Sequence, residues 1–376
     1  MRLTGPCDPK GSVQECIGFS TYKGSSSPYR PSCLFFGKSE RLTASRSVCQ
    51  KPARVAKGRT SAMTLDEDAP ATAAPVRPDL RLTDRGLLRL ELFPAPAEVA
   101  PYVTTFFRMR CDERSIRDVQ PSSIGLLAVM ARGRGHIRFL DGRVEPSQRL
   151  TLMTPTSAAA TFEVEGPWHL FGTTLSPLGW AALTGLSASE HGNRLYDGET
   201  VLGPAFAGMT QKIAVEFDSL SVEAMIELFS NAILSSIRRV PAGHKRFLQT
   251  VAQWLVGSLS PDLAGLFAVS GYSPRQTQRL VDHYFGLPPT ALARKYRALR
   301  AAVVLSDPAT TPEQIAAVQD HFYDQPHMIR ELRLFAGRTP ARIADPDTPY
   351  LSAMLDLRNF REIGPRLAPI PADLRA

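Results

Sequence analysis

A stripe of arginine and glutamine side chains near residue 280 has the chemistry to read DNA bases. Over 273–285, one helical face carries Thr277, Leu280, Val281 and Tyr284, and the other carries Arg275, Gln278, Arg279 and Asp282, with Gln276 beside them. Arginine pairs with guanine, and glutamine with adenine, through two hydrogen bonds in the major groove. The stripe predicts a recognition helix over 273–285, although the solvated face of any amphipathic helix would also be polar.

A second copy of this pattern lies 51 residues further along the chain. Arg279 corresponds to Arg330, Gly286 to Gly337 and Pro289 to Pro340. The copy predicts a short helix at 315–318, a turn at 321–323 and a second recognition helix over 325–335. A longer helix between the copies has Arg294, Lys295, Arg297 and Arg300 on its polar positions. Two such helix-turn-helix units would place two recognition helices about one DNA turn apart, roughly 34 Å.

Ser/Thr-Pro pairs mark the starts of the helices that must position these side chains. Ser260-Pro261, Ser273-Pro274 and Thr311-Pro312 each put a capping hydroxyl before a proline at the first helical position. Gln276 and Gln314 complete two predicted capping boxes. Gly271 sits in the turn before 273–285, where a positive φ is expected. An amphipathic helix over 222–239 precedes the helical part as a linker or dimer element.

Short apolar runs between Leu80 and Ser176 predict a β-rich barrel or sandwich. The segment 124–130 is followed by Arg132-Gly133-Arg134-Gly135, which is read as a turn, and then by 136–140 and Asp141-Gly142, a hairpin signal. A short helix is expected from Ser176-Pro177 to about Leu183. Trp168 and His169 are candidates for lining a pocket, with core packing as the alternative.

The net charge of +8 over 376 residues comes from the N-terminal segment, not from the helical part. Residues 1–62 hold eleven Lys and Arg against three acids, so 63–376 are neutral overall, and only 244–343 are modestly basic, at +5. The segment 1–62 also holds Cys7, Cys16, Cys33 and Cys49 without a C-x-x-C pattern. We interpret it as an unstructured extension with Met63 as the natural start, a transit peptide being the alternative. No run reaches the ~18 apolar residues of a membrane span, which predicts no membrane partner.

The helical part resembles the AraC/XylS family of bacterial transcription regulators. The resemblance is carried by Gly271-Tyr-Ser-Pro-Arg-Gln-Thr-Gln-Arg279, Phe285-Gly-Leu-Pro-Pro289, Arg297-Ala-Leu-Arg300, Phe322-Tyr-Asp-Gln-Pro-His-Met-Ile-Arg330 and Phe335-Ala-Gly-Arg-Thr-Pro340. It covers about a hundred residues, 244–343. It implies a multidomain α+β chain: a β-rich, faintly cupin-like N-terminal domain followed by an all-α domain with two helix-turn-helix units.

The resemblance also implies roles for individual residues on double-stranded DNA. Base contacts fall to Arg275, Gln276, Gln278 and Arg279 in the first unit and to Gln325, His327 and Arg330 in the second; Arg294, Arg297 and Arg338 are candidate phosphate contacts. His321 stands where the family usually has glycine, and Pro326 lies in the first turn of the second helix. These departures predict that the second unit acts mainly as a clamp.

No motif of nucleophilic, phosphate-binding or metallo-hydrolase chemistry is found, and His136, His169 and His191 are isolated, so no enzyme activity, metal or cofactor is predicted. Cys111, beside two acids, is a poor nucleophile.

The domains expected are an extension and linker over 1–79, a β-rich effector or dimerisation domain over 80–221, a linker helix over 222–243, the DNA-binding domain over 244–343 and a tail over 344–376. The function expected is an effector-responsive transcription activator in the cytoplasm. A homodimer, a small-molecule effector of unknown site and, for an activator, RNA polymerase are the partners. The alternative is a cupin-like enzyme or sensor whose helical part is a protein-interaction module.

Overall fold

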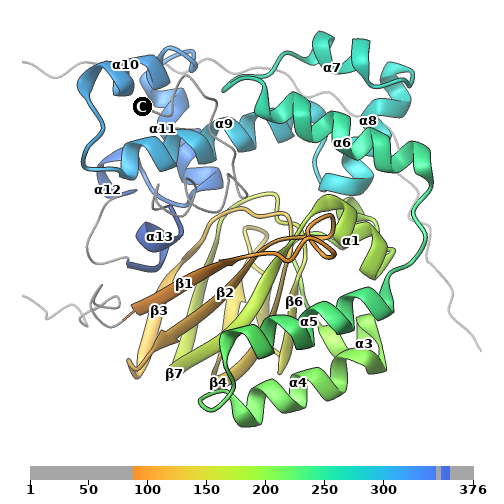
Figure 1. Cartoon of the computed structure of the whole chain (residues 1–376). Helices are drawn as coiled ribbons and strands as arrows, with labels where there is room; N and C mark the ends of the chain where they lie inside the picture. The colour runs from red at the N-terminus through yellow and green to blue at the C-terminus, as the bar shows by residue number, and fades with distance from the viewer. Residues whose placement is uncertain (1–87, 344–348, 356–376) are drawn as a thin grey trace, which may run out of the picture. The chain divides into compact units, whose positions relative to one another are not determined.

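The structure, a computed structural model, describes residues 88–343 and 349–355 (Figure 1). These residues belong to one compact unit, 73–376. The predicted extension and linker over 1–79, with Met63 and the four N-terminal cysteines, lie outside the described residues.

The N-terminal half of the described chain is an antiparallel sheet of eight strands, which confirms the predicted β-rich architecture. The strands run in the order β1-β2-β7-β4-β6-β8, with β3 paired to β7 and β5 paired to β4. Their bounds are β1 Leu88–Pro94, β2 Val103–Cys111, β3 Ser115–Gln120, β4 Leu126–Arg138, β5 Val144–Pro146, β6 Leu150–Met153, β7 Ala160–Leu175 and β8 Leu195–Asp197. The long β4 and β7 pair along most of their length and form the centre of the sheet.

The predicted turn at Arg132–Gly135 is wrong, because this segment lies inside β4. The register between β4 and β7 shifts at Met130/Arg132 and again at Arg132/Arg134, which marks bulges in a continuous strand. Gly133 has φ +79°, and a Cβ at Gly135 would lie 2.2 Å from the carbonyl oxygen of Glu163. The glycines therefore allow a bent strand and a close backbone approach. The hairpin at Asp141-Gly142 is confirmed, with Gly142 at φ +85° between β4 and β5.

Side chains alternate between the two faces of the sheet along each strand, and each face contributes buried residues to an apolar cluster. On one face, Phe106 stacks on Phe171 at 6.1 Å between ring centroids, and both rings meet Phe229 of α5 (Val222–Ser236). Figure 1 shows α5 beside α4 (Pro204–Glu216) along the sheet. The remaining helices of this region are α1 Pro177–Thr184, α2 Ala188–His191 and α3 Gly198–Leu202. The predicted helix at 222–239 thus exists as α5, although it ends at Ser236, and it packs on the sheet.

The C-terminal half is helical and has its own apolar core, which confirms the predicted fold class. Its helices are α6 Ala242–Val256, α7 Leu263–Val269, α8 Pro274–Phe285, α9 Pro289–Ser306, α10 Pro312–Gln319, α11 Gln325–Phe335, α12 Pro340–Ile343 and α13 Pro349–Met354. Two helix–turn–helix pairs, α7–α8 and α10–α11, flank α9. The helix α13 lies within the segment 344–376, for which the sequence analysis predicts only a tail.

Side-chain caps mark the starts of four of these helices, α7, α8, α10 and α11. Ser273 caps α8 and Thr311 caps α10. Of the two predicted capping boxes, the one at Thr311 and Gln314 is confirmed, whereas at Ser273 and Gln276 only the serine half forms. The predicted start at Ser260-Pro261 is wrong, because Asp262 caps α7 and accepts a hydrogen bond of 2.9 Å from the amide of Gly265. A carboxylate two residues downstream replaces the expected hydroxyl, so the helix begins later.

Candidate nucleic-acid interface

The turn of the first helix–turn–helix unit is fixed by a small hydrogen-bond network. Gly271 has φ +72°, as the sequence predicts, and it separates α7 from α8. The hydroxyl of Thr277 lies 2.9 Å from the hydroxyl of Ser270, and Thr277 is fully buried. These contacts tie the first turn of α8 to the end of α7. Such anchoring fixes the direction in which the exposed side chains of α8 point.

The inward face of α8 is buried along its whole length. Leu280, Val281 and Tyr284 pack in the helical core, as the sequence pattern predicts. The Tyr284 hydroxyl lies 2.7 Å from Nδ1 of His244 on α6. Gly286, at φ +75°, ends the helix through a hydrogen bond of 2.9 Å to the carbonyl of Asp282. The helix is therefore held at both ends and along one side.

The outward face of α8 presents three of the four predicted base-contacting side chains to solvent. Arg275, Gln278 and Arg279 are exposed, and Gln276 is half-buried. Within the described residues, no hydrogen bond or ion pair holds the side chains of Arg275, Gln278 and Arg279. Two guanidinium groups and an amide on one rigid helix form a surface that can donate hydrogen bonds to base edges and accept hydrogen bonds from them.

The second unit presents a smaller free surface. The carboxylate of Asp324 accepts a hydrogen bond of 2.6 Å from the amide of His327 and so caps α11. Gln325 and Arg330 are exposed, and His327 is half-buried. Arg333, which is not among the predicted contacts, is also exposed one helical turn after Arg330. The two arginines are adjacent positive charges on the outer side of α11.

Three of the predicted DNA contacts converge instead on one buried carboxylate, Glu331. Nε of Arg294 lies 2.6 Å from Oε1, Nε2 of His327 lies 3.0 Å from the same oxygen, and the Arg297 guanidinium contacts both oxygens. The Arg297 guanidinium also lies 4.8 Å above the centre of the Phe322 ring. The side chain of Arg297 is only 16% exposed, whereas that of Arg294 is 45% exposed. Arg297 therefore holds α11 to α9. Of these two arginines, only Arg294 is exposed enough to contact a DNA phosphate.

Glu331 is not among the site residues predicted from the sequence, although a local signal for it exists. Glu331 follows the buried Met328 by three residues and precedes the buried Phe335 by four, which places it on the inward face of α11. A carboxylate on a buried face requires partners, because an unpaired buried charge is costly. The partners are the arginines of α9.

Arg338, another predicted phosphate contact, faces the sheet region. Its guanidinium lies 3.6 Å from Oδ1 of Asp118 on β3, and its side chain is 17% exposed. Asp118 also accepts hydrogen bonds from the backbone amides of Val119 and Tyr350. Burial raises the pKa of Asp118 to about 6, while these donors and Arg338 oppose that rise. The arrangement assigns Arg338 to the contact between the sheet and helical regions.

A second contact between the regions is made by Lys295 of α9, which is fully buried. Its Nζ donates hydrogen bonds of 2.7 Å and 2.8 Å to the carbonyl oxygens of Ser123 and Thr156. Burial lowers the pKa of Lys295 to about 7. A long, polar-tipped side chain from the helix between the two units is thus inserted into the sheet region.

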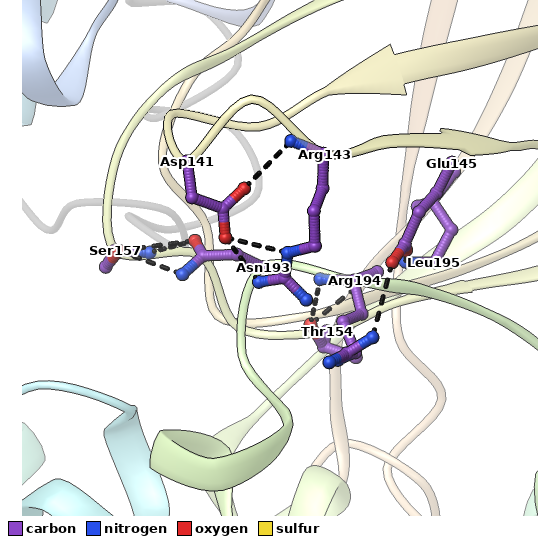
Figure 2. Close-up of polar contacts among 8 residues, drawn as sticks. All are labelled: Asp141, Arg143, Glu145, Thr154, Ser157, Asn193, Arg194 and Leu195. Atoms are coloured by element: carbon purple, nitrogen blue, oxygen red, sulfur yellow. Dashed lines mark hydrogen bonds and ion pairs between the residues drawn. The ribbon is translucent and has the colours of Figure 1, made fainter. Parts of the chain in front are cut away.

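The loop that receives Lys295 is itself held by Asn193 and Arg194, which lie in the segment before β8. Oδ1 of Asn193, at φ +56°, accepts hydrogen bonds from the amide and hydroxyl of Ser157, at 2.9 Å and 3.2 Å (Figure 2). The hydroxyl of Thr154 accepts a hydrogen bond of 2.9 Å from the amide of Arg194 (Figure 2). The Thr156 carbonyl between these two anchors is therefore presented at a fixed position.

The face of the sheet opposite α5 encloses a cavity of about 150 Å³. Its wall is mainly apolar and includes Phe107, Met109, Phe162, Trp168 and Leu170. His169 points to the other face, where it lies 2.8 Å from Asp112 and stacks on Phe217. Of the two residues that the sequence suggests for a pocket, Trp168 lines the cavity and His169 does not.

Residues 88–343 and 349–355 show neither a candidate metal site nor a candidate membrane span. No group of three or more His, Cys, Asp or Glu side chains in these ranges could hold a metal ion. In the same ranges, no helix has the length and hydropathy of a membrane span. Cys111 is buried in the sheet core.

Three solved structures to which the chain is similar share 9–12% sequence identity with it. No protein-family model and no curated protein matches the chain. The AraC-like transcriptional activator CuxR is 12% identical over 57% of this chain and 86% of its own, with a TM-score of 0.26. ToxT from Vibrio cholerae O395 is 9% identical over 70% of this chain and 99% of its own, with a TM-score of 0.39. ToxT bound to (E)-4-(8-methylnaphthalen-1-yl)but-3-enoic acid is 9% identical over 69% and 99%, with a TM-score of 0.38.

Proposed function

We propose that this chain is a sequence-specific DNA-binding transcription regulator of the AraC/XylS type. The observation that carries the proposal is the outward face of α8, where Arg275, Gln278 and Arg279 are exposed on a helix anchored along its inward face. Arginine and glutamine are the side chains that pair with guanine and adenine in the major groove. Gln276, half-buried beside them, completes the base-reading set.

The second unit contributes a weaker surface in this proposal. Gln325 and Arg330 meet bases or backbone from α11, with Arg333 and Arg294 as the neighbouring positive charges. His327 and Arg297 act through Glu331 by fixing the position of α11. The second unit is therefore mainly a clamp, and α8 supplies most of the sequence reading. The two recognition helices enter successive major grooves.

The alternative function, an enzyme or sensor with a helical protein-interaction module, requires apolar exposed faces on α8 and α11. The exposed positions of these helices include Arg275, Arg279, Arg330 and Arg333. Positive side chains on both helices fit a polyanion better than an apolar partner. We therefore favour a DNA-binding regulator over an enzyme.

In this proposal, regulation occurs because ligand binding changes the relative populations of two conformations of the chain. A small-molecule effector or a second copy of the chain, bound to the sheet region, changes how the two units are presented to DNA. Lys295 and Arg338 are the contacts through which such a change would pass. As an activator the chain would also contact RNA polymerase, and it would act in the bacterial cytoplasm, where the DNA is.

The direct test is DNA binding by the full chain, measured against the DNA upstream of its own gene and a scrambled fragment at several salt concentrations. We expect preferential binding to the upstream fragment, with a log–log salt slope of about 0.9 per phosphate contact. The double variant Arg275→Ala and Arg279→Ala should lose this preference. The control is Arg134→Ala together with Arg143→Ala, which removes two positive charges from the sheet region.

Two outcomes would contradict the proposal. One is the absence of binding to either fragment even at low salt. The other is an equal loss of binding in the α8 variant and in the sheet control, because this result would show that total charge alone carries the affinity.

A further inference from the structure

Tyr350 of α13 fills an aromatic slot in the wall of the sheet cavity. Its ring centroid lies 5.0 Å from that of Phe162 and 5.8 Å from that of Trp168. Its hydroxyl donates a hydrogen bond to Oε1 of Gln120 on β3, and its backbone amide donates one of 3.1 Å to Oδ2 of Asp118. A segment that follows both helix–turn–helix units in the sequence therefore reaches back into the sheet region and forms part of the cavity wall.

The slot has the composition of a site for an uncharged ring. Among the described residues, the cavity wall contains no Asp, Glu, Lys or Arg. Its polar members are His136 and amide or hydroxyl side chains such as those of Gln120, Ser123 and Thr151. A charged ligand placed there would lose its hydration without gaining an opposite charge. An apolar cavity of about 150 Å³ is large enough for a benzene-sized molecule, and filling it adds dispersion contacts that empty space lacks.

The side chain of Tyr350 shows which ligand suits the slot. It is a para-substituted phenol whose ring packs against Phe162 and Trp168 and whose hydroxyl reaches Gln120. We propose that the cavity is a binding site for a small uncharged phenol-type aromatic molecule, and that Tyr350 is the built-in competitor for this site. The ligand takes the slot and the adjoining cavity, and Tyr350 leaves with α13.

Displacement of Tyr350 also alters the contact between the sheet and helical regions. Asp118 receives the Tyr350 amide on one oxygen and lies near the Arg338 guanidinium with the other. Two residues beyond Gln120, the amide of Ser122 donates a hydrogen bond of 2.8 Å to the carbonyl of Phe335 at the end of α11. When α13 leaves the sheet, it therefore removes a contact at the end of β3, and this end of β3 also holds α11. This step rests on the proposed function, since its consequence is a changed DNA affinity.

The test is isothermal titration calorimetry of the full chain with p-cresol, without DNA. We expect p-cresol to bind Tyr350→Ala at least about tenfold more tightly than the wild type, because the competitor is gone; tenfold corresponds to about 1.4 kcal/mol. Toluene, which cannot bond to Gln120, should bind Tyr350→Ala more weakly than p-cresol does, and the anion p-toluate should not bind. The matched control Tyr323→Ala removes a tyrosine that is 93% exposed and lies outside the cavity wall, and it should leave the affinity unchanged.

A second variant covers the case in which Tyr350→Ala does not fold cooperatively. Tyr350→Phe keeps the ring and removes only the hydrogen bond to Gln120, so p-cresol should bind it several-fold more tightly than the wild type. Equal p-cresol affinity in the wild type and in every folded Tyr350 variant overturns the proposal. The absence of p-cresol binding at millimolar concentration in all variants overturns it as well.

Measurements of DNA affinity on the same proteins distinguish failure of the ligand site from failure of the proposed function. The affinity of ligand-free Tyr350→Ala for the upstream fragment should equal that of the wild type saturated with p-cresol, and it should differ from that of the ligand-free wild type. Specific DNA binding together with no p-cresol binding would refute only the ligand site. Tighter p-cresol binding by Tyr350→Ala, with no DNA binding by any form, would refute only the regulator.

Discussion

The backbone amide of Ala159 donates a hydrogen bond of 2.8 Å to the carbonyl oxygen of Leu334. Ser122 makes the equivalent bond to Phe335, so two carbonyls in the last turn of α11 are satisfied by the sheet region. The last carbonyls of a helix have no hydrogen-bond donor inside the helix. When the helix end is buried, other parts of the chain must supply these donors. The sheet region thus takes part in ending the second recognition helix, and this connects the state of the sheet to the position of α11.

Gly337, directly after this contact, should be intolerant of any side chain. It has φ +83°, and a Cβ there would lie 2.2 Å from Cγ1 of Val119 and 3.1 Å from Cβ of Ala159. Gly337→Ala should lower the free energy of unfolding by about 1–3 kcal/mol for overpacking, in addition to the cost of the positive φ. Urea unfolding measures the change.

The control for Gly337→Ala is Gly271→Ala. Gly271 has a similar φ of +72°, but a Cβ there would meet nothing within 4 Å. It should therefore show only the backbone cost, of about 1–2 kcal/mol. Equal losses in the two variants would mean that the sheet and helical regions do not pack at Gly337 as the structure shows.

Glu331→Gln should destabilise the second unit strongly. Glu331 is fully buried and is the shared acceptor of Arg294, Arg297 and His327. Neutralising it leaves the largely buried Arg297 without an opposite charge, a change that typically costs about 3–5 kcal/mol. Chemical denaturation checks the stability, and DNA titration should show weaker binding because α11 is no longer held on α9.

Arg294→Ala is the comparison for Glu331→Gln. It removes one half-exposed partner and leaves the contacts of Arg297 with Glu331 in place. The loss of stability should be about 1 kcal/mol or less, as for exposed ion pairs. A loss as large as that of Glu331→Gln would show that Arg294, and not Arg297, carries the interaction.

Arg279→Ala should relax DNA specificity at one base position. The side chain is exposed at the middle of α8, and no hydrogen bond or ion pair within the described residues holds it. A bidentate arginine contact is worth about 1–3 kcal/mol at its own base pair. Competition between operator variants, each changed at one position, measures the pattern of loss. A uniform loss across all sequences, with the salt slope reduced by about 1, would make Arg279 a phosphate contact.

The parts of the fold that depend on local chemistry were predictable from the sequence. The positive φ at Gly271, the capping box at Thr311 and the bounds of α11 each follow from residues within a few positions of one another. The start of α7 was misplaced because both Ser260 and Asp262 are good capping residues, and the local sequence does not decide between them.

The parts that depend on contacts between distant residues were not predictable. The partner of Arg297 is 34 residues away and that of Lys295 is 172 residues away, so arginine and lysine positions on α9 could not be assigned to surface or interior from periodicity. The glycines at 133 and 135 signal a turn locally, and only the pairing with β7 makes them bulges. The helix α13 is six residues long and too short to show a helical period.

Lys295→Met should remove a pH dependence of stability that the wild type carries. Burial lowers the pKa of Lys295 from 10.5 to about 7 in the folded chain. Between these values the unfolded chain binds more protons than the folded chain, so the free energy of unfolding rises with pH, by up to about 1.4 kcal/mol per pH unit. The methionine variant has no amine to titrate, and it also loses the hydrogen bonds to Ser123 and Thr156.

Urea unfolding of both proteins between pH 7 and pH 10 gives the comparison, because their other titrating groups are shared. The difference in unfolding free energy, wild type minus Lys295→Met, should increase steadily as the pH rises. Lys245→Met, which removes an exposed lysine of α6, serves as the matched Lys-to-Met control for the effect of the substitution itself. Parallel curves for the wild type and Lys295→Met would show that the Lys295 amine keeps its ordinary pKa, and hence that it reaches water instead of the two carbonyls of the sheet region.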